Sequence, residues 1–164
     1  MLQEQLLDGG TDVAVLYGLE IGGALRSELL WSMPPYVVLP ATHRLADLAG
    51  EPMIMLDAPP SKVHMLTALA GVGIAPTIGR VTRNFETLRS LVGRGYGWGL
   101  LVQHPAVDRS YEGMPIRSVA IADPIEPAPV VAATVAGSAS PHRTLACIEL
   151  LRGLAPPQPR SGGL

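Results

Sequence analysis

The chain alternates short apolar runs with segments whose apolar residues recur at helical spacing, and glycine or proline separates most of them. This alternation of strands and helices predicts an α/β architecture with mostly parallel sheets. The predicted strands cover residues 13–17, 28–33, 36–40, 52–56, 77–81, 100–102, 116–121 and 130–136. The predicted helices cover residues 1–8, 61–70 and 85–92, and a last one begins near residue 140. A tail rich in proline and glycine, residues 155–164, is expected to be disordered.

Composition limits the partners that such a chain can have. With 164 residues, of which 48% are hydrophobic, it can bury the core of one domain or of two small lobes. A net charge of -2 gives no positive surface for DNA phosphates or an anionic membrane. The single cysteine excludes an internal disulfide, and no apolar run approaches the roughly 20 residues of a membrane span. No signal peptide is recognisable, so we expect a cytoplasmic protein.

Glycine occupies every second position of residues 93–99, within the segment LVGRGYGWGLLV. A glycine run can bind phosphate when it follows a strand and opens a helix. Here the predicted helix comes first and the predicted strand second, and no Lys-Ser or Lys-Thr pair follows. The order favours a structural turn between helix and strand over a nucleotide site.

Combinations of residues that could carry catalysis have simpler structural explanations. Ser61 and His64 lie three residues apart on a predicted helix, but a cap and a surface histidine explain them, and no third orienting group is placed. His104 and Asp108 are similarly interpreted as a surface pair. The histidines lack a second ligand at metal spacing: His43, His64, His104 and His142. We therefore expect no catalytic residues, no metal site and no cofactor.

Four segments, taken in order, resemble the effector-binding domain of LysR-type transcriptional regulators. They are LLDGGTDVAV, VVLPATHRLAD, FETLRSLVGRGYGWGLLVQHP and VVAATVAGSASPHRTLACIELLR. The resemblance covers residues 1 to about 153. It implies a fold like that of the type 2 periplasmic binding proteins, in which two α/β lobes hold a small effector in the cleft between them.

The resemblance also implies how the chain is divided. Residues 1–56, with about 130–154, correspond to the first lobe, and residues 57–129 correspond to the second. The match begins after the family's first strand, first helix and second strand of this domain, so we expect a truncated chain with an incomplete first lobe. No segment resembles the family's helix-turn-helix, so DNA is expected to be bound only through a domain absent from this chain. A homodimer or a larger oligomer is expected from the family.

Carried over by position, the resemblance places Pro60, Ser61 and Lys62 at a helix start beside the cleft. The Ser61 hydroxyl and the helix N–H groups could donate to a carboxylate, and Lys62 could attract it at longer range. The effector is therefore expected to be a small molecule, in particular a carboxylate.

Four further positions are candidates for the same site. Thr82, Arg83 and Asn84 precede the next predicted helix, although capping alone explains Asn84 and solvation alone explains Arg83. Ligands of α/β sheets bind beyond the carboxyl ends of strands, which adds Tyr17 and Gln103.

The sequence therefore predicts an effector-binding regulatory domain and not an enzyme. Two alternatives stay open. A truncated solute-binding protein would share the fold, and the lack of a signal peptide and of disulfides weighs against export unless truncation removed the signal. An enzyme on the same fold would need a nucleophile, a base and an oxyanion donor that the sequence does not bring together.

Overall fold

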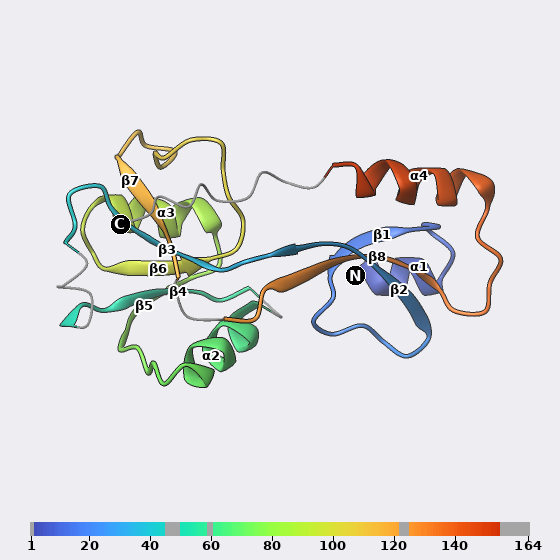
Figure 1. Cartoon of the computed structure of the whole chain (residues 1–164), viewed down its shortest axis with the longest axis horizontal. Coiled ribbons are helices and arrows are strands. Elements are labelled where there is room, and N and C mark those ends of the chain that lie inside the picture. The colour runs from blue at the N-terminus through green and yellow to red at the C-terminus, as the bar shows by residue number, and fades with distance from the viewer. Residues whose placement is uncertain (1, 45–49, 59–60, 122–124, 155–164) are drawn as a thin grey trace. The chain divides into compact units, whose positions relative to one another are not determined.

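The computed structural model describes residues 2–44, 50–58, 61–121 and 125–154 (Figure 1). The chain divides into two compact units, one built from Met1–Met33 with the segment that begins at Ala128, the other from Pro34–Pro127. The sequence predicted that the first lobe extends to residue 56. Residues 34–56 belong instead to the second unit, because both strands in this segment pair within its sheet. An apolar run indicates that a strand is buried but does not indicate its partner.

The sheet of the first unit has three strands in the order β1-β8-β2. These strands are β1 (Ala14–Tyr17), β8 (Ala128–Val135) and β2 (Leu25–Met33). The expectation of mostly parallel sheets is wrong here, because β8 pairs antiparallel with both neighbours. β8 returns from the far end of the chain and separates β1 from β2, and no local pattern in the sequence indicates this insertion.

Two helices accompany this sheet, as the sequence predicted. In α1 (Leu2–Leu7), Leu6 is buried against Ala14, Leu25 and Ala133. α4 (His142–Arg152) buries Ile148. An ion pair of 2.7 Å between Arg143 Nη2 and Asp12 Oδ2 ties α4 to the turn before β1.

The second unit holds a mixed sheet in the order β5-β4-β6-β3-β7. Its strands are β3 (Tyr36–Pro40), β4 (Met53–Leu56), β5 (Ile78–Thr82), β6 (Trp98–Leu101) and β7 (Ile116–Ala120). β4 pairs parallel with β5 and β6, whereas β3 pairs antiparallel with β6 and β7. The predicted strands of this region are confirmed, and among its described residues only β4, β5 and β6 form parallel pairs.

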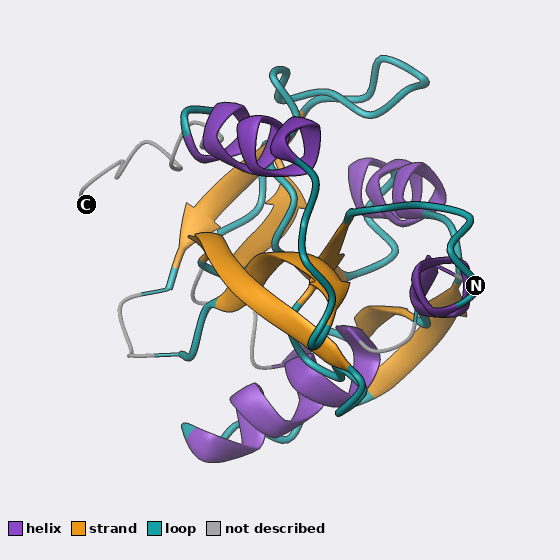
Figure 2. Cartoon of the chain, turned by 90° about the vertical axis from the view of Figure 1, so that its right-hand side faces the viewer, coloured by secondary structure: helices purple, strands orange, loops and turns teal. Residues whose placement is uncertain are grey.

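Helices α2 (Ser61–Gly71) and α3 (Phe85–Gly93) connect these parallel strands. α3 lies on one face of the sheet and α2 on the other (Figure 1). Figure 2 shows the helices and strands from a second direction. Leu88 and Val92 of α3 are fully buried against Tyr36, Val38 and Ile54. The helical spacing of the apolar residues in α3 thus produces the face that covers the sheet.

The glycine run is a structural turn, as its position in the sequence predicted. α3 ends at Gly93 and β6 begins at Trp98. Gly95 and Gly97 have φ values of +79° and +134°, which favour glycine. The Trp98 N–H donates to the Pro52 carbonyl oxygen at 3.2 Å, so the turn runs directly against the start of β4.

Two features that bear on function are not found in the described part of the chain. None of its helices is long and apolar enough to cross a membrane. Successive helices there are always separated by at least one strand, so the described residues form no helix-turn-helix.

Candidate functional site

One edge of the five-stranded sheet gathers most of the predicted site residues. β4, β5 and β6 run in the same direction, so their carboxyl ends lie at the same edge. The chain continues from there into α2 after β4, into α3 after β5 and into a loop after β6. These strand ends and the segments that follow them contain Lys62, Thr82, Arg83, Asn84 and Gln103.

Asp57 lies directly after β4 and pairs with two of the predicted residues. Its Oδ1 lies 3.1 Å from Lys62 Nζ, and its Oδ2 lies 3.9 Å from Arg83 Nε. We call these three residues the Asp57 cluster. The Asp57 side chain is 27% exposed, whereas the side chains of Lys62 and Arg83 are 42% and 87% exposed. Both cations can therefore be reached from solvent.

The sequence analysis did not select Asp57 as a site residue. The available signal was its place immediately after an apolar strand, the same criterion that selected Tyr17 and Gln103. The Asp57 N–H donates to the Thr82 carbonyl oxygen at 2.7 Å, and this bond joins the ends of β4 and β5. This bond fixes the position of the Asp57 backbone, from which the carboxylate extends toward the two cations.

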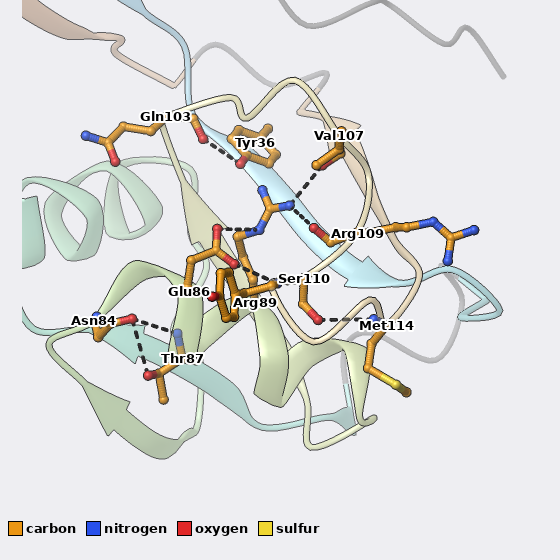
Figure 3. A network of polar contacts seen from close by, with 11 residues as sticks. Tyr36, Asn84, Glu86, Thr87, Arg89, Gln103, Val107, Arg109, Ser110 and Met114 are labelled. Carbon is orange, nitrogen blue, oxygen red and sulfur yellow. Dashed lines mark hydrogen bonds and ion pairs between the residues drawn. The ribbon is translucent and has the colours of Figure 1, made fainter.

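Asn84 and Thr82 have structural roles at the start of α3. The Asn84 side-chain oxygen accepts from the Thr87 N–H at 2.9 Å and from the Thr87 hydroxyl at 3.3 Å (Figure 3). The Asn84 N–H donates to the Thr82 hydroxyl oxygen at 3.2 Å. Capping, which the sequence offered as the simpler explanation, therefore accounts for Asn84.

Replacing Asn84 with alanine tests this assignment. We expect the free energy of unfolding to fall by about 1 kcal/mol, because the Thr87 N–H loses its acceptor. Urea unfolding measures the change, and Asn84→Asp, which retains a capping oxygen, is the control. Unchanged stability in the alanine variant would contradict a capping role.

Gln103 contributes its backbone, while its side chain is exposed and directed away from Tyr36 in Figure 3. The Tyr36 hydroxyl donates to the Gln103 carbonyl oxygen at 2.7 Å. Burial raises the pKa of the Tyr36 hydroxyl, so it stays a donor at neutral pH. The His104 ring lies against the Tyr36 ring with centroids 3.7 Å apart. Burial also lowers the pKa of His104, with Asp108 acting in the opposite direction.

The remaining predicted residues are not brought into this group. Pro60 lies outside the described residues. α2 begins at Ser61, as predicted, but the structure does not describe the Ser61 side chain. Tyr17 ends β1 in the first unit and is half-buried. In the parts of the chain that the structure describes, no three His, Cys, Asp or Glu side chains are grouped in a way that could hold a metal ion.

A buried arginine fixes the segment that follows β6. The Arg89 guanidinium of α3 is 3% exposed and donates to the carbonyl oxygens of Val107, at 2.9 Å, and Arg109 (Figure 3). Its Nε also lies 3.3 Å from Glu86 Oε1, and Glu86 accepts from the Tyr111 N–H at 3.0 Å. The sequence analysis did not single out Arg89, because an arginine between apolar helix positions gives no local sign that its guanidinium is buried.

A shallow hollow of about 380 Å³ lies against α3, on the side of this segment. It is lined by Asn84, Glu86, Thr87, Ser90, Leu91, Arg94, Tyr111 and Glu112. Its charged groups are paired within the protein, since Arg94 Nε lies 3.0 Å from Glu112 Oε2 and Glu86 pairs with Arg89. The Asp57 cluster, in which two cations share one carboxylate, is the stronger candidate for binding a small anion.

The mixed sheets and the element order are those of a periplasmic-binding-protein-like α/β domain. The family model of the LysR substrate binding domain matches residues 1–156. The chain therefore belongs to the family of LysR substrate-binding domains. Homologues in this family are effector-binding regulatory domains of transcriptional regulators and are not enzymes.

Solved structures agree with this assignment. HinK, a LysR family transcriptional regulator from Pseudomonas aeruginosa, is 28% identical with a TM-score of 0.85, over 93% of this chain and 55% of HinK. The C-terminal domain of a probable LysR family transcriptional regulator from Rhodococcus sp. RHA1 is 40% identical with a TM-score of 0.81, over 92% of this chain and 78% of that one. The chain thus spans little more than half the length of HinK. No curated protein sequence matches it.

More distant structures share the fold. The effector binding domain of BenM, solved with its effector benzoate, is 22% identical with a TM-score of 0.71, over 95% of this chain and 77% of that one. The effector binding domain of QuiR, solved with shikimate, is 17% identical with a TM-score of 0.70, over 92% of this chain and 74% of that one.

Proposed function

We propose that this chain binds a small carboxylate as the effector-binding part of a LysR-type transcription regulator, and that the Asp57 cluster receives the carboxylate. The observation that carries the proposal is the position of Lys62 and Arg83. Both are accessible cations, and they lie where the parallel strands β4 and β5 have their carboxyl ends. Benzoate and shikimate, bound by BenM and QuiR, are both carboxylates, which supports the ligand class.

Each part of the cluster has a different role in this proposal. Lys62 offers a mobile ammonium group, whereas Arg83 offers a planar guanidinium that can donate two parallel hydrogen bonds to a carboxylate. The N-terminus of α2 adds a partial positive charge. We also propose that the effector contacts the remaining predicted residues, which are Pro60, Ser61, Thr82, Tyr17 and Gln103.

In this proposal, other parts of the regulator convert effector binding into a change in DNA binding. An effector that binds one conformation more tightly than another shifts the population toward it. We propose that this shift reaches DNA through a helix-turn-helix domain and through a homodimer or larger oligomer. A regulator acts where the DNA is, so we also propose a cytoplasmic location.

Isothermal titration with benzoate and shikimate tests the proposal, with benzamide as the neutral analogue of benzoate. We expect at least one of the two carboxylates to bind and benzamide to bind at least tenfold more weakly. Lack of binding by both carboxylates would contradict the proposed ligand class.

Lys62→Met tests the position of the site. We expect this substitution to weaken carboxylate binding about tenfold, because a charge-assisted hydrogen bond is lost. Arg143→Met is the matched control, since it removes one exposed, ion-paired cation in the first unit. Equal effects of the two substitutions would contradict a site at the Asp57 cluster. Lys62 is also the only lysine of the chain, so a ¹³C-methylated side chain would report binding as a single lysine signal in NMR spectra.

A further inference from the structure

We propose that Asp57 is an internal anion that determines the specificity of the site, so that it favours monocarboxylates over dicarboxylates. This inference rests on the proposed function of the Asp57 cluster. It concerns the total charge of the ligand, which neither the fold nor the similarity to other proteins specifies.

The two oxygens of Asp57 face different cations. Oδ1 lies 3.1 Å from Lys62 Nζ and Oδ2 lies 3.9 Å from Arg83 Nε, so the carboxylate bridges α2 and the end of β5. This is the arrangement that a bound carboxylate would adopt between the same two side chains. Asp57 therefore competes with a ligand for the donors of Lys62 and Arg83.

The competition is incomplete, because both cations keep accessible surface. Arg83 is 87% exposed, and its Nε lies 3.9 Å from Asp57 Oδ2, too far for a hydrogen bond, so its donors remain available to a ligand. Lys62 is 42% exposed and carries three donors. A ligand carboxylate can thus bind beside Asp57 without displacing it.

The charge balance then selects among ligands. Two cations and one anion leave the cluster with a net charge of +1. One ligand carboxylate neutralises this charge, whereas a second carboxylate on the same molecule meets no uncompensated cation and is repelled by Asp57. At about 4 Å in water this repulsion corresponds to roughly a fivefold loss of affinity.

The substitution Asp57→Asn tests the inference, because asparagine keeps the size of the side chain and removes the charge. Isothermal titration at low ionic strength compares benzoate with phthalate, which adds a second carboxylate to the same ring. We expect the native chain to prefer benzoate. In the variant, both ligands should bind more tightly, and phthalate should gain about fivefold more than benzoate.

Asp12→Asn is the matched control. Asp12 is also a partly exposed aspartate paired with an arginine, at 2.7 Å, but it belongs to the first unit. The substitution changes the net charge of the chain by the same amount. We expect the ratio of the two affinities to stay at its native value, so a change equal to that of Asp57→Asn would contradict a local effect.

A measurement on the native chain makes the test independent of the folding of any variant. Salt screens interactions between exposed charges, so at 0.5 M NaCl, about a 4 Å Debye length, the preference for benzoate should narrow. Two results would overturn the role of Asp57 and leave the proposed function standing. In the first, benzoate binds but the ratio of the benzoate and phthalate affinities is the same in Asp57→Asn as in the native chain. In the second, benzoate binds and salt does not change the preference of the native chain for benzoate over phthalate. Absence of carboxylate binding in both native chain and variant would overturn both.

Discussion

Replacing Gly97 with alanine is expected to lower the free energy of unfolding of the second unit by about 3 kcal/mol or more. The φ of +134° at this position already strains any residue with a side chain. An added Cβ would lie 2.0 Å from the Pro52 carbonyl oxygen and 3.1 Å from the Pro52 carbonyl carbon. Both are backbone atoms, so the clash cannot be relieved by turning a side chain.

The consequence reaches the centre of the sheet. Pro52 leads into β4, and Trp98, which follows Gly97, pairs with Met53 in the parallel ladder between β4 and β6. Any movement that frees the new Cβ also separates the Trp98 N–H from the Pro52 oxygen, a bond of 3.2 Å. Asp57 directly follows β4, and the loop that contains Gln103 follows β6. The candidate site is therefore expected to be lost when these strands separate.

Urea unfolding measured by Trp98 fluorescence, in a Trp31→Phe background that leaves one tryptophan, reports on this unit. Gly95→Ala is the matched control, because Gly95 has a φ of +79° but nothing within 4 Å of an added Cβ. Gly95→Ala is expected to lower the free energy of unfolding by about 1 kcal/mol. Equal costs at the two positions would show that the contact with Pro52 is unimportant.

The local elements could be predicted because their signals are local. The apolar positions of α3 recur at helical spacing, and the glycines that follow have to end the helix before the next apolar run. The same information does not specify which strands pair. β8 lies between β1 and β2 although more than ninety residues separate it from β2, and β3 and β4 join the second unit.

The candidate site shows the same division. Lys62 was selected because the family resemblance places a helix start beside the cleft, and Arg83 was selected because it precedes the next predicted helix. Asp57 was missed as their partner because an ion pair across two loops depends on strand order. Arg89 was missed because burial of a charged side chain depends on carbonyl groups about twenty residues away, at Val107 and Arg109.

Replacing Arg89 with methionine is expected to destabilise the second unit by about 3 kcal/mol. Methionine preserves much of the aliphatic stem, so the loss arises from the guanidinium. Its removal leaves the carbonyl oxygens of Val107 and Arg109 without their donor, and Glu86 without its cation. Breaking such a buried charged network by removing one partner is more costly than losing an exposed pair.

The segment that Arg89 holds should loosen before the sheet does. Hydrogen exchange at the Ser110 and Tyr111 amides is therefore expected to accelerate in Arg89→Met, beyond the effect on global unfolding by urea. Arg94→Met is the matched control, because Arg94 caps the C-terminus of the same helix and pairs with Glu112 at 3.0 Å, but at an exposed position. It should leave stability nearly unchanged, since exposed ion pairs contribute little. If both substitutions had the same small effect, the segment after β6 would be held by its own backbone turns, and Arg89 would be only a buried residue of α3.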